Sequence, residues 1–308
     1  MTMQQARPRH IVLATDLSAR CDRAFERAVL LAGEWNAQMT VVHALERRLP
    51  GGASGPRWRT IDRESLNAES QILTDLHRAG IAADIVVRRG PASELIAEIA
   101  RSTSCDLIVT GIARELGFTR SVLGATLEAL THKSTAPILI ASRPVRGPYE
   151  RAVVGTNFSP GSRAALQATL HLFEQTKTAA LHAYRPVLEG LGSAHIDNEA
   201  AYQHLLKECT QLVADAVPWR KVQCLAEAGS PEMLLRDYVL DRNADLIAIG
   251  SESRSPMATF LLGSTSTSLI LSPPCDLLLV PAKWAAPDGE AVDARHQSEA
   301  QVPGSSRA

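Results

Sequence analysis

SCDLIVTG, residues 104–111, returns as NADLIAIG, residues 243–250, 139 positions along the chain. Four residues keep identical counterparts at this offset: Gly90, Asp106, Gly111 and Gly124 match Gly229, Asp245, Gly250 and Gly263. Asp16 and Ser18 find Asn157 and Ser159 at an offset of 141, so the second copy is two residues shorter after its first strand. The period exceeds the roughly 20–50 residues of solenoid repeats, and each copy is long enough to form a domain.

The repeat divides the chain of 308 residues into two domains, as expected for roughly 150 residues per domain. We expect a first domain at 8–142, a polar linker rich in proline and glycine at 143–150, and a second domain at 151–283. Residues 284–308 have few large apolar side chains, which predicts a disordered tail.

The composition excludes several classes of protein. Hydrophobic residues make up 45% of the chain and the net charge is −1, so no strong field attracts it to nucleic acid or to an anionic membrane. No apolar run reaches the roughly 18 residues of a membrane span, and the first residues lack the apolar core of a secretory signal. We therefore expect a cytoplasmic protein.

The five cysteines do not form a recognisable framework. Their number is odd, no Cys-x-x-Cys occurs, and their positions do not repeat between the halves. This pattern predicts neither a set of structural disulfides nor a zinc site, and it favours small buried side chains.

Strand and helix patterns alternate in both halves, which predicts an α/β fold with a parallel sheet and helices on both faces. The runs DLIVTG and DLLLV are continuously apolar, as in strands covered on both faces. Ligands of such sheets bind beyond the carboxyl ends of the strands, where the winding direction reverses. If it reverses beside the first strand, one crevice is lined by Thr15, Asp16 and the loop after Gly111. The other is lined by Thr156, Asn157 and the loop after Gly250.

The loop after the fourth strand of the second half carries a family resemblance. It reads GSESRSPMATFLLGST from residue 250 to residue 265. With the strand pattern and the opening ATDLS, it resembles the universal stress proteins, whose nucleotide loop is Gly-x2-Gly-x9-Gly-Ser/Thr. Gly250, Gly263 and Ser264 match that loop, Thr265 follows, and Ser253 stands where the second glycine is expected.

The first half matches the same loop less well. Gly111 and Gly124 are in place, but Arg114 replaces the second glycine. Ala125 replaces the Ser/Thr, and Thr126 follows one position later. Arg114 either fills the phosphate site or pairs with a phosphate. The resemblance implies two tandem Rossmann-like domains, like those of the adenine-nucleotide α-hydrolases, each with a five-stranded parallel sheet.

The resemblance also implies a ligand, namely ATP or a related adenine nucleotide, with or without Mg²⁺. Glycines allow the backbone to approach a phosphate, and a helix N-terminus offers free N–H groups to it. In this family an aspartate after the first strand contacts the nucleoside; Asp16 stands there in the first half and Asn157 in the second. Because the phosphates supply most of the charged contacts, we rank the second half ahead as the nucleotide site.

Structural roles compete with these functional ones. Asp16 and Asn157 are also typical of residues that cap a following helix. Gly124 and Gly263 are equally compatible with close packing of a helix on the sheet. His43 and His182, which both end the second strand of their half, fit best as hydrogen-bonded structural histidines.

The sequence supports two candidate functions. The first is a stress-response regulatory protein that binds nucleotide and hydrolyses it slowly at most, since the chain has no Walker lysine motif. The second is a nucleotide-independent scaffold in which the halves form an intramolecular pseudo-dimer, with or without further pairing into a homodimer. The family resemblance implies contact through the fifth strands, PILIA and DLLLV. Motifs of nucleotidyl transferases and ATP pyrophosphatases are absent, which argues against a third, enzymatic function.

Overall fold

The computed structural model describes residues 7–45, 62–112, 125–184, 198–218, 220–251 and 264–285. The first half consists of β1 (His10–Thr15), α1 (Asp22–Trp35), β2 (Gln38–Leu45), α2 (Arg63–Ala79), β3 (Asp84–Arg89), α3 (Ala92–Ser102), β4 (Leu107–Thr110), α4 (Ala125–Lys133) and β5 (Ile138–Ile140). The second half repeats the plan with β6 (Arg151–Thr156), α5 (Pro160–Leu172), β7 (Lys177–Tyr184), α6 (Asn198–Ala216), β8 (Gln223–Ala228), α7 (Pro231–Arg242), β9 (Leu246–Ser251), α8 (Ser264–Leu271) and β10 (Asp276–Pro281). The predicted α/β fold with tandem Rossmann-like halves is confirmed.

Local sequence signals explain the helix limits. On α1, Ala24, Ala28 and Leu31 recur at helical spacing and are fully buried. The helix α2 ends at Gly80, whose φ of 65° is the left-handed conformation that glycine adopts without strain. Pro231 opens α7, where its missing N–H is no loss.

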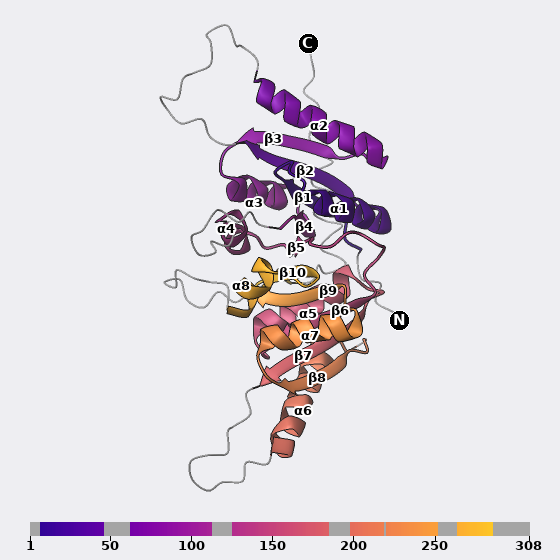
Figure 1. Cartoon of the computed structure of the whole chain (residues 1–308), viewed down its shortest axis with the longest axis vertical. Coiled ribbons are helices and arrows are strands. Elements are labelled where there is room, and N and C mark those ends of the chain that lie inside the picture. The colour runs from indigo at the N-terminus through magenta and orange to yellow at the C-terminus, as the bar shows by residue number, and fades with distance from the viewer. Residues whose placement is uncertain are drawn as a thin grey trace, which may run out of the picture.

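The strands form one sheet across both halves. Its order is β3-β2-β1-β4-β5-β10-β9-β6-β7-β8, so each half is parallel and winds outward from a reversal beside its first strand (Figure 1). The expectation that the first and fourth strands are neighbours is confirmed, because β1 pairs with β4 and β6 pairs with β9.

Two layers of helices cover the sheet. Side chains of α1, α2, α5 and α6 pack on one face, and those of α3, α4, α7 and α8 pack on the other. The central strands are buried on both faces, which explains their continuously apolar sequences. Within the described residues, none of the helices is both long and apolar enough to cross a bilayer.

The halves meet through their fifth strands, as expected for a pseudo-dimer. β5 and β10 are antiparallel, with Leu139 opposite Leu278 at the centre of the pairing. At the edge of this junction the Asp276 carboxylate accepts hydrogen bonds from the backbone N–H groups of Ser142 and Arg143, at 2.8 and 3.0 Å. The segment expected to be a plain polar linker is thus fixed against the second half.

Candidate functional site

Two crevices are expected from the sheet order, one in each half. In the first half the carboxyl ends of β1 and β4 lie side by side, with Ala14 opposite Thr110. In the second half β6 and β9 lie together in the same way, with Val154 opposite Ala248. At each of these points the chain leaves toward opposite ends of the sheet, which opens the space where ligands of such folds bind.

The turn after β1 is held together by Asp16. Its Oδ1 accepts hydrogen bonds from the backbone N–H of Ser18 at 2.9 Å, from the Ser18 hydroxyl at 2.5 Å and from the Cys21 thiol at 3.2 Å. Leu17 has a φ of 58°, and its N–H donates to Thr15 Oγ1 at 3.0 Å. Burial raises the pKa of Asp16, but the hydrogen bonds from Ser18 and Cys21 outweigh it, and the pKa is lowered overall. Asp16 is therefore ionised and already engaged by its own turn.

The turn after β6 has the same shape with an amide in place of the acid. Asn157 Oδ1 accepts from the N–H of Ser159 at 3.2 Å, and Phe158 has a φ of 63°. Ser159 caps α5, because its side chain accepts from the N–H of Ser162 at 3.3 Å. The alternative that Asp16 and Asn157 cap the next helix is wrong: each instead bonds the N–H two residues on, which is an Asx turn.

A histidine supports each turn from the neighbouring strand. His43 Nδ1 lies 2.9 Å from the carbonyl oxygen of Thr15, and His182 Nδ1 lies 2.9 Å from that of Thr156. Since a carbonyl only accepts, the ring nitrogen donates in both cases. The hydrogen bonds expected of structural histidines are therefore present at both positions.

Glycine is required where each fourth strand leaves the sheet. A Cβ at Gly111 would lie 2.5 Å from the Arg20 carbonyl oxygen. At Gly250 it would lie 2.3 Å from the carbonyl carbon and oxygen of Gly161, in the first turn of α5. These glycines therefore let the end of β4 or β9 approach the start of α1 or α5 closely.

The phosphate loops themselves lie mostly outside the described residues, and so do Arg114, Gly124, Ser253 and Gly263. Ser264 is the first residue of α8, Thr265 follows it half-buried, and Thr126 is exposed as the second residue of α4. The structure thus confirms that a helix begins directly after each loop. The roles of these seven residues toward a ligand stay predictions.

A cavity adjoins the turn of the first half. It has a volume of about 440 Å³ and lies between α1 and α2, with Thr15, Ser18, Cys21, Val41 and Ile72 in its lining. The side of the β1–α1 turn is therefore open to a small molecule.

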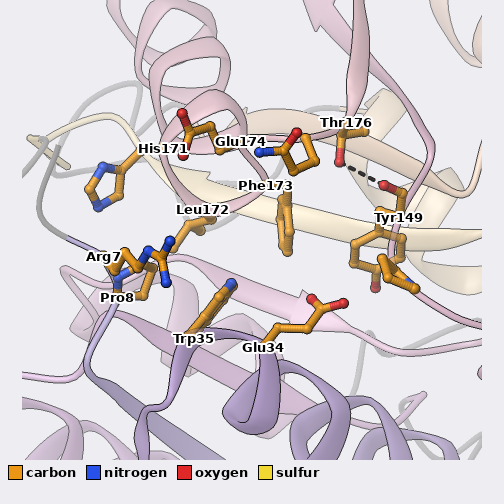
Figure 2. A pocket seen from close by; sticks show the side chains of 12 residues that line it. Arg7, Pro8, Glu34, Trp35, Tyr149, His171, Leu172, Phe173, Glu174 and Thr176 are labelled. Carbon is orange, nitrogen blue, oxygen red and sulfur yellow. Dashed lines mark hydrogen bonds between the residues drawn. The ribbon is translucent and has the colours of Figure 1, made fainter. Parts of the chain in front are cut away.

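A second cavity, of about 360 Å³, lies where the ends of α1 and α5 approach each other across the two halves. Figure 2 shows Glu34 and Trp35 on one side of it, and Phe173 and Tyr149 on the other. The Phe173 ring is 6.0 Å from that of Trp35 and 5.0 Å, edge-on, from that of Tyr149. No repeat motif pointed to this cavity, because it exists only where the two halves meet.

Comparison with known proteins agrees with this architecture. The model of the universal stress protein family matches residues 8–142 and again residues 148–281. A universal stress protein of Mycolicibacterium smegmatis is 22% identical over 294 residues, covering 90% of this chain and 99% of its own length. Universal stress protein A homolog 1 of Coxiella burnetii is 28% identical over 136 residues, covering 42% of this chain and 94% of its own.

A solved structure shows the same fold across both halves. The universal stress protein from Archaeoglobus fulgidus superposes with a TM-score of 0.64 at 20% identity, covering 89% of this chain and 98% of its own. This structural match and the two matches to the family model agree that the chain consists of two similar halves with the same fold. The chain belongs to the universal stress protein family, as a tandem protein with two family domains.

Proposed function

We propose that this chain is a cytoplasmic stress-response regulator that binds ATP or a related adenine nucleotide in one or both crevices. The observation that carries the proposal is the meeting of three features at each crevice. These are the reversal of the sheet order, the Asx turn after the first strand, and a helix that begins after the glycine loop.

The first crevice offers a carboxylate for the nucleoside end of the ligand. All three hydrogen bonds that hold Asp16 in its turn go to Oδ1, so the Oδ2 atom remains for a ribose hydroxyl or for Mg²⁺. Asn157 gives the second crevice an uncharged acceptor at the same place. The second crevice has the loop sequence closer to the family pattern, and we rank it first for the phosphates.

Hydrolysis is proposed to be weak at most. The histidines at the crevices, His43 and His182, are engaged with backbone carbonyls of their own turns. The chain also has no Walker lysine motif to hold the phosphates for hydrolysis. Binding would act by ordering the loops and changing the surface presented to a protein partner.

Calorimetry on the intact protein tests the proposal. ATP is titrated with and without Mg²⁺ into the wild type, Gly124→Asp and Gly263→Asp, because a new carboxylate in a phosphate loop repels the ligand. Gln211→Glu, on the exposed face of α6, adds the same charge away from both crevices and is the matched control. Loss of binding with Gly263→Asp supports the second crevice, and loss with Gly124→Asp supports the first.

A nucleotide-independent scaffold is the second candidate function, and the pairing of β5 with β10 favours it. This pairing already makes one continuous sheet of the two halves without a ligand. The absence of heat at about 1 mM ATP, which corresponds to about −4 kcal/mol of binding free energy, would leave this function in place of the first.

A further inference from the structure

Two cysteines that are separate in the sequence meet on one face of the outer sheet. Cys209 is fully buried on α6, and Cys224 is partly exposed on β8, the edge strand of the second half. Both pack into the same apolar cluster between that helix and the sheet. The interpretation of the cysteines as buried hydrophobic side chains holds for four of the five, and Cys224 is the exception.

Cys209 and Cys224 share a neighbour where α6 packs on the sheet. Cys209 Sγ lies 3.8 Å from the carbonyl oxygen of Ala180, and Ala180 is the residue directly opposite Cys224 in the pairing of β7 with β8. Cys209 and Cys224 lie close enough for each thiol to shift the pKa of the other, and the Cys224 thiol itself lies 4.0 Å from the carbonyl oxygen of Val222. The two thiols are thus held together by a helix and a strand that pack on each other.

The same contacts make the two sulfurs chemically different. The hydrogen bond from Cys209 lowers the pKa of Cys224, burial opposes this, and Thr210 adds to the lowering. The bond to Cys224 and burial both raise the pKa of Cys209. The thiolate is the nucleophilic form of cysteine, so the partly exposed sulfur is also the reactive one.

We propose that Cys224 and Cys209 form an oxidation site in which a small hydroperoxide converts the two thiols into an intramolecular disulfide. A small oxidant is required because α6 covers the face of β8 on which Cys224 lies. No other cysteine shares this arrangement among the described residues: Cys21, Cys105 and Cys275 are buried, and burial raises the pKa of each.

The reaction has two steps. The Cys224 thiolate attacks the O–O bond of the hydroperoxide, so an S–O bond forms, the O–O bond breaks, and an alcohol or water leaves after protonation. The Cys209 sulfur then attacks the resulting sulfenic acid, so the S–S bond forms, the S–O bond breaks, and the Cys209 proton leaves with the hydroxide as water. In sum, two thiols and one hydroperoxide give one disulfide, one alcohol or water, and one further water.

The bridge would join α6 to the outermost strand of the sheet. It would fix the helix against β8 and reduce the opening of this edge, since a cross-link restricts the chain between its ends. The pair lies on α6 and on the edge strand β8, whereas the crevices lie at the ends of β1 and β4 and of β6 and β9.

The sequence around the two cysteines allows a direct test. Trypsin cleaves after Lys207, Arg220, Lys221 and Arg236, which places Cys209 and Cys224 on separate peptides, 208–220 and 222–236. The intact protein is treated with hydrogen peroxide, its remaining thiols are alkylated, and the digest is analysed by mass spectrometry. We expect the two peptides to be joined in monomeric protein and to separate after reduction with dithiothreitol.

Variants distinguish the site from general oxidation. Cys275→Ser, a buried thiol outside the pair, should bridge like the wild type, whereas Cys224→Ser should not bridge. Cys209→Ser should stop at a sulfenic acid on Cys224 that dimedone traps. We expect Cys224 to oxidise at least about tenfold faster than Cys275. The proposal is overturned by equal oxidation of both, by a bridge between two chains, or by a Cys224 sulfenic acid that persists in the wild type.

Discussion

The side chain of Arg27, on α1 of the first half, forms a buried ion pair with Asp276, at the start of β10 in the second half. Arg27 Nε lies 3.3 Å from Asp276 Oδ2, and the two side chains are 5% and 1% exposed. The Tyr149 hydroxyl donates to the same carboxylate at 2.6 Å, and the ring of Tyr149 lies 4.1 Å from the Arg27 guanidinium carbon. Burial and the neighbouring Asp276 raise the pKa of Tyr149 far above its ordinary value, so it remains a donor. The two halves are therefore joined by a polar cluster as well as by the sheet.

The first prediction concerns this ion pair. Asp276→Asn leaves the buried charge of Arg27 uncompensated, and we expect a loss of about 3–5 kcal/mol of unfolding free energy. Adding Arg27→Met should recover part of it, because the unpaired charge is then gone. Urea denaturation measures both.

A solvent-exposed ion pair provides the control for the buried one. Arg88 and Glu98 also form an ion pair, at 2.9 Å, but their side chains are 47% and 57% exposed. Glu98→Gln should therefore change the unfolding free energy by less than about 1 kcal/mol. A loss for Asp276→Asn no larger than that would contradict the role given to the buried pair.

The second prediction concerns Gly250. An alanine there would place its Cβ 2.3 Å from the backbone of Gly161, so the strand and α5 must separate. We expect Gly250→Ala to cost about 1–3 kcal/mol. Gly33 lies inside α1 with nothing within 4 Å of its Cβ position, and Gly33→Ala should instead stabilise by about 0.5–1 kcal/mol. Equal effects of the two substitutions in thermal unfolding would show that the close approach is unimportant.

Most of the fold could be predicted from the sequence, but the buried Arg27–Asp276 pair could not. The duplication and the alternation of strand and helix predicted the fold, and they predicted neighbouring first and fourth strands on the condition that the winding reverses beside the first strand. The contact between the fifth strands was implied by the family resemblance. Arg27 lies among Ala24, Ala28 and Leu31 on the buried face of α1, and its partner was not among the predictions. Its identity, Asp276, was not predictable, because it lies in the other half and has Pro137 as its counterpart in the repeat.

The candidate site was predictable to a similar extent. The repeat showed that Asp16 and Asn157 are equivalent, but not that each bonds its own turn, since a cap and an Asx turn use the same residue types. The contact of Cys209 with Cys224 depends on how α6 packs on β8, and no spacing in the sequence encodes that. Contacts across elements, rather than the elements themselves, were the part that required the structure.

The third prediction concerns His171, which lines the cavity between the halves and is 7% exposed. Neither ring nitrogen has a hydrogen-bond partner among the described residues, and burial lowers the pKa of the ring below its ordinary 6.5. The folded protein therefore resists protonation, so stability should fall as the pH decreases below about 6.5. His171→Leu should remove this slope between pH 7.5 and pH 5.5 in urea denaturation, whereas an unchanged slope would contradict the role of His171.

The fourth prediction concerns the acid in the first crevice. Because the pKa of Asp16 is lowered from 3.8, its ionised form stabilises the fold above that pH, and the contribution is lost as the pH falls through the lowered pKa. Asp16→Asn should therefore be less stable than the wild type near neutral pH, and the difference should shrink in acid. Asn157→Asp places a carboxylate in the matching turn and should gain a pH dependence of the same sign. A difference for Asp16→Asn that does not change with pH would contradict the ionised carboxylate.

The central claim, that the crevices hold an adenine nucleotide, is tested most directly by photolabelling with 8-azido-ATP. The labelled protein is digested, and the modified peptides are identified by mass spectrometry with and without excess ATP as competitor. The account predicts label that ATP displaces, on peptides that carry the turns after β1 or β6 or the loops after Gly111 or Gly250. Label that ATP does not displace, or displaceable label confined to peptides away from both crevices, would contradict it.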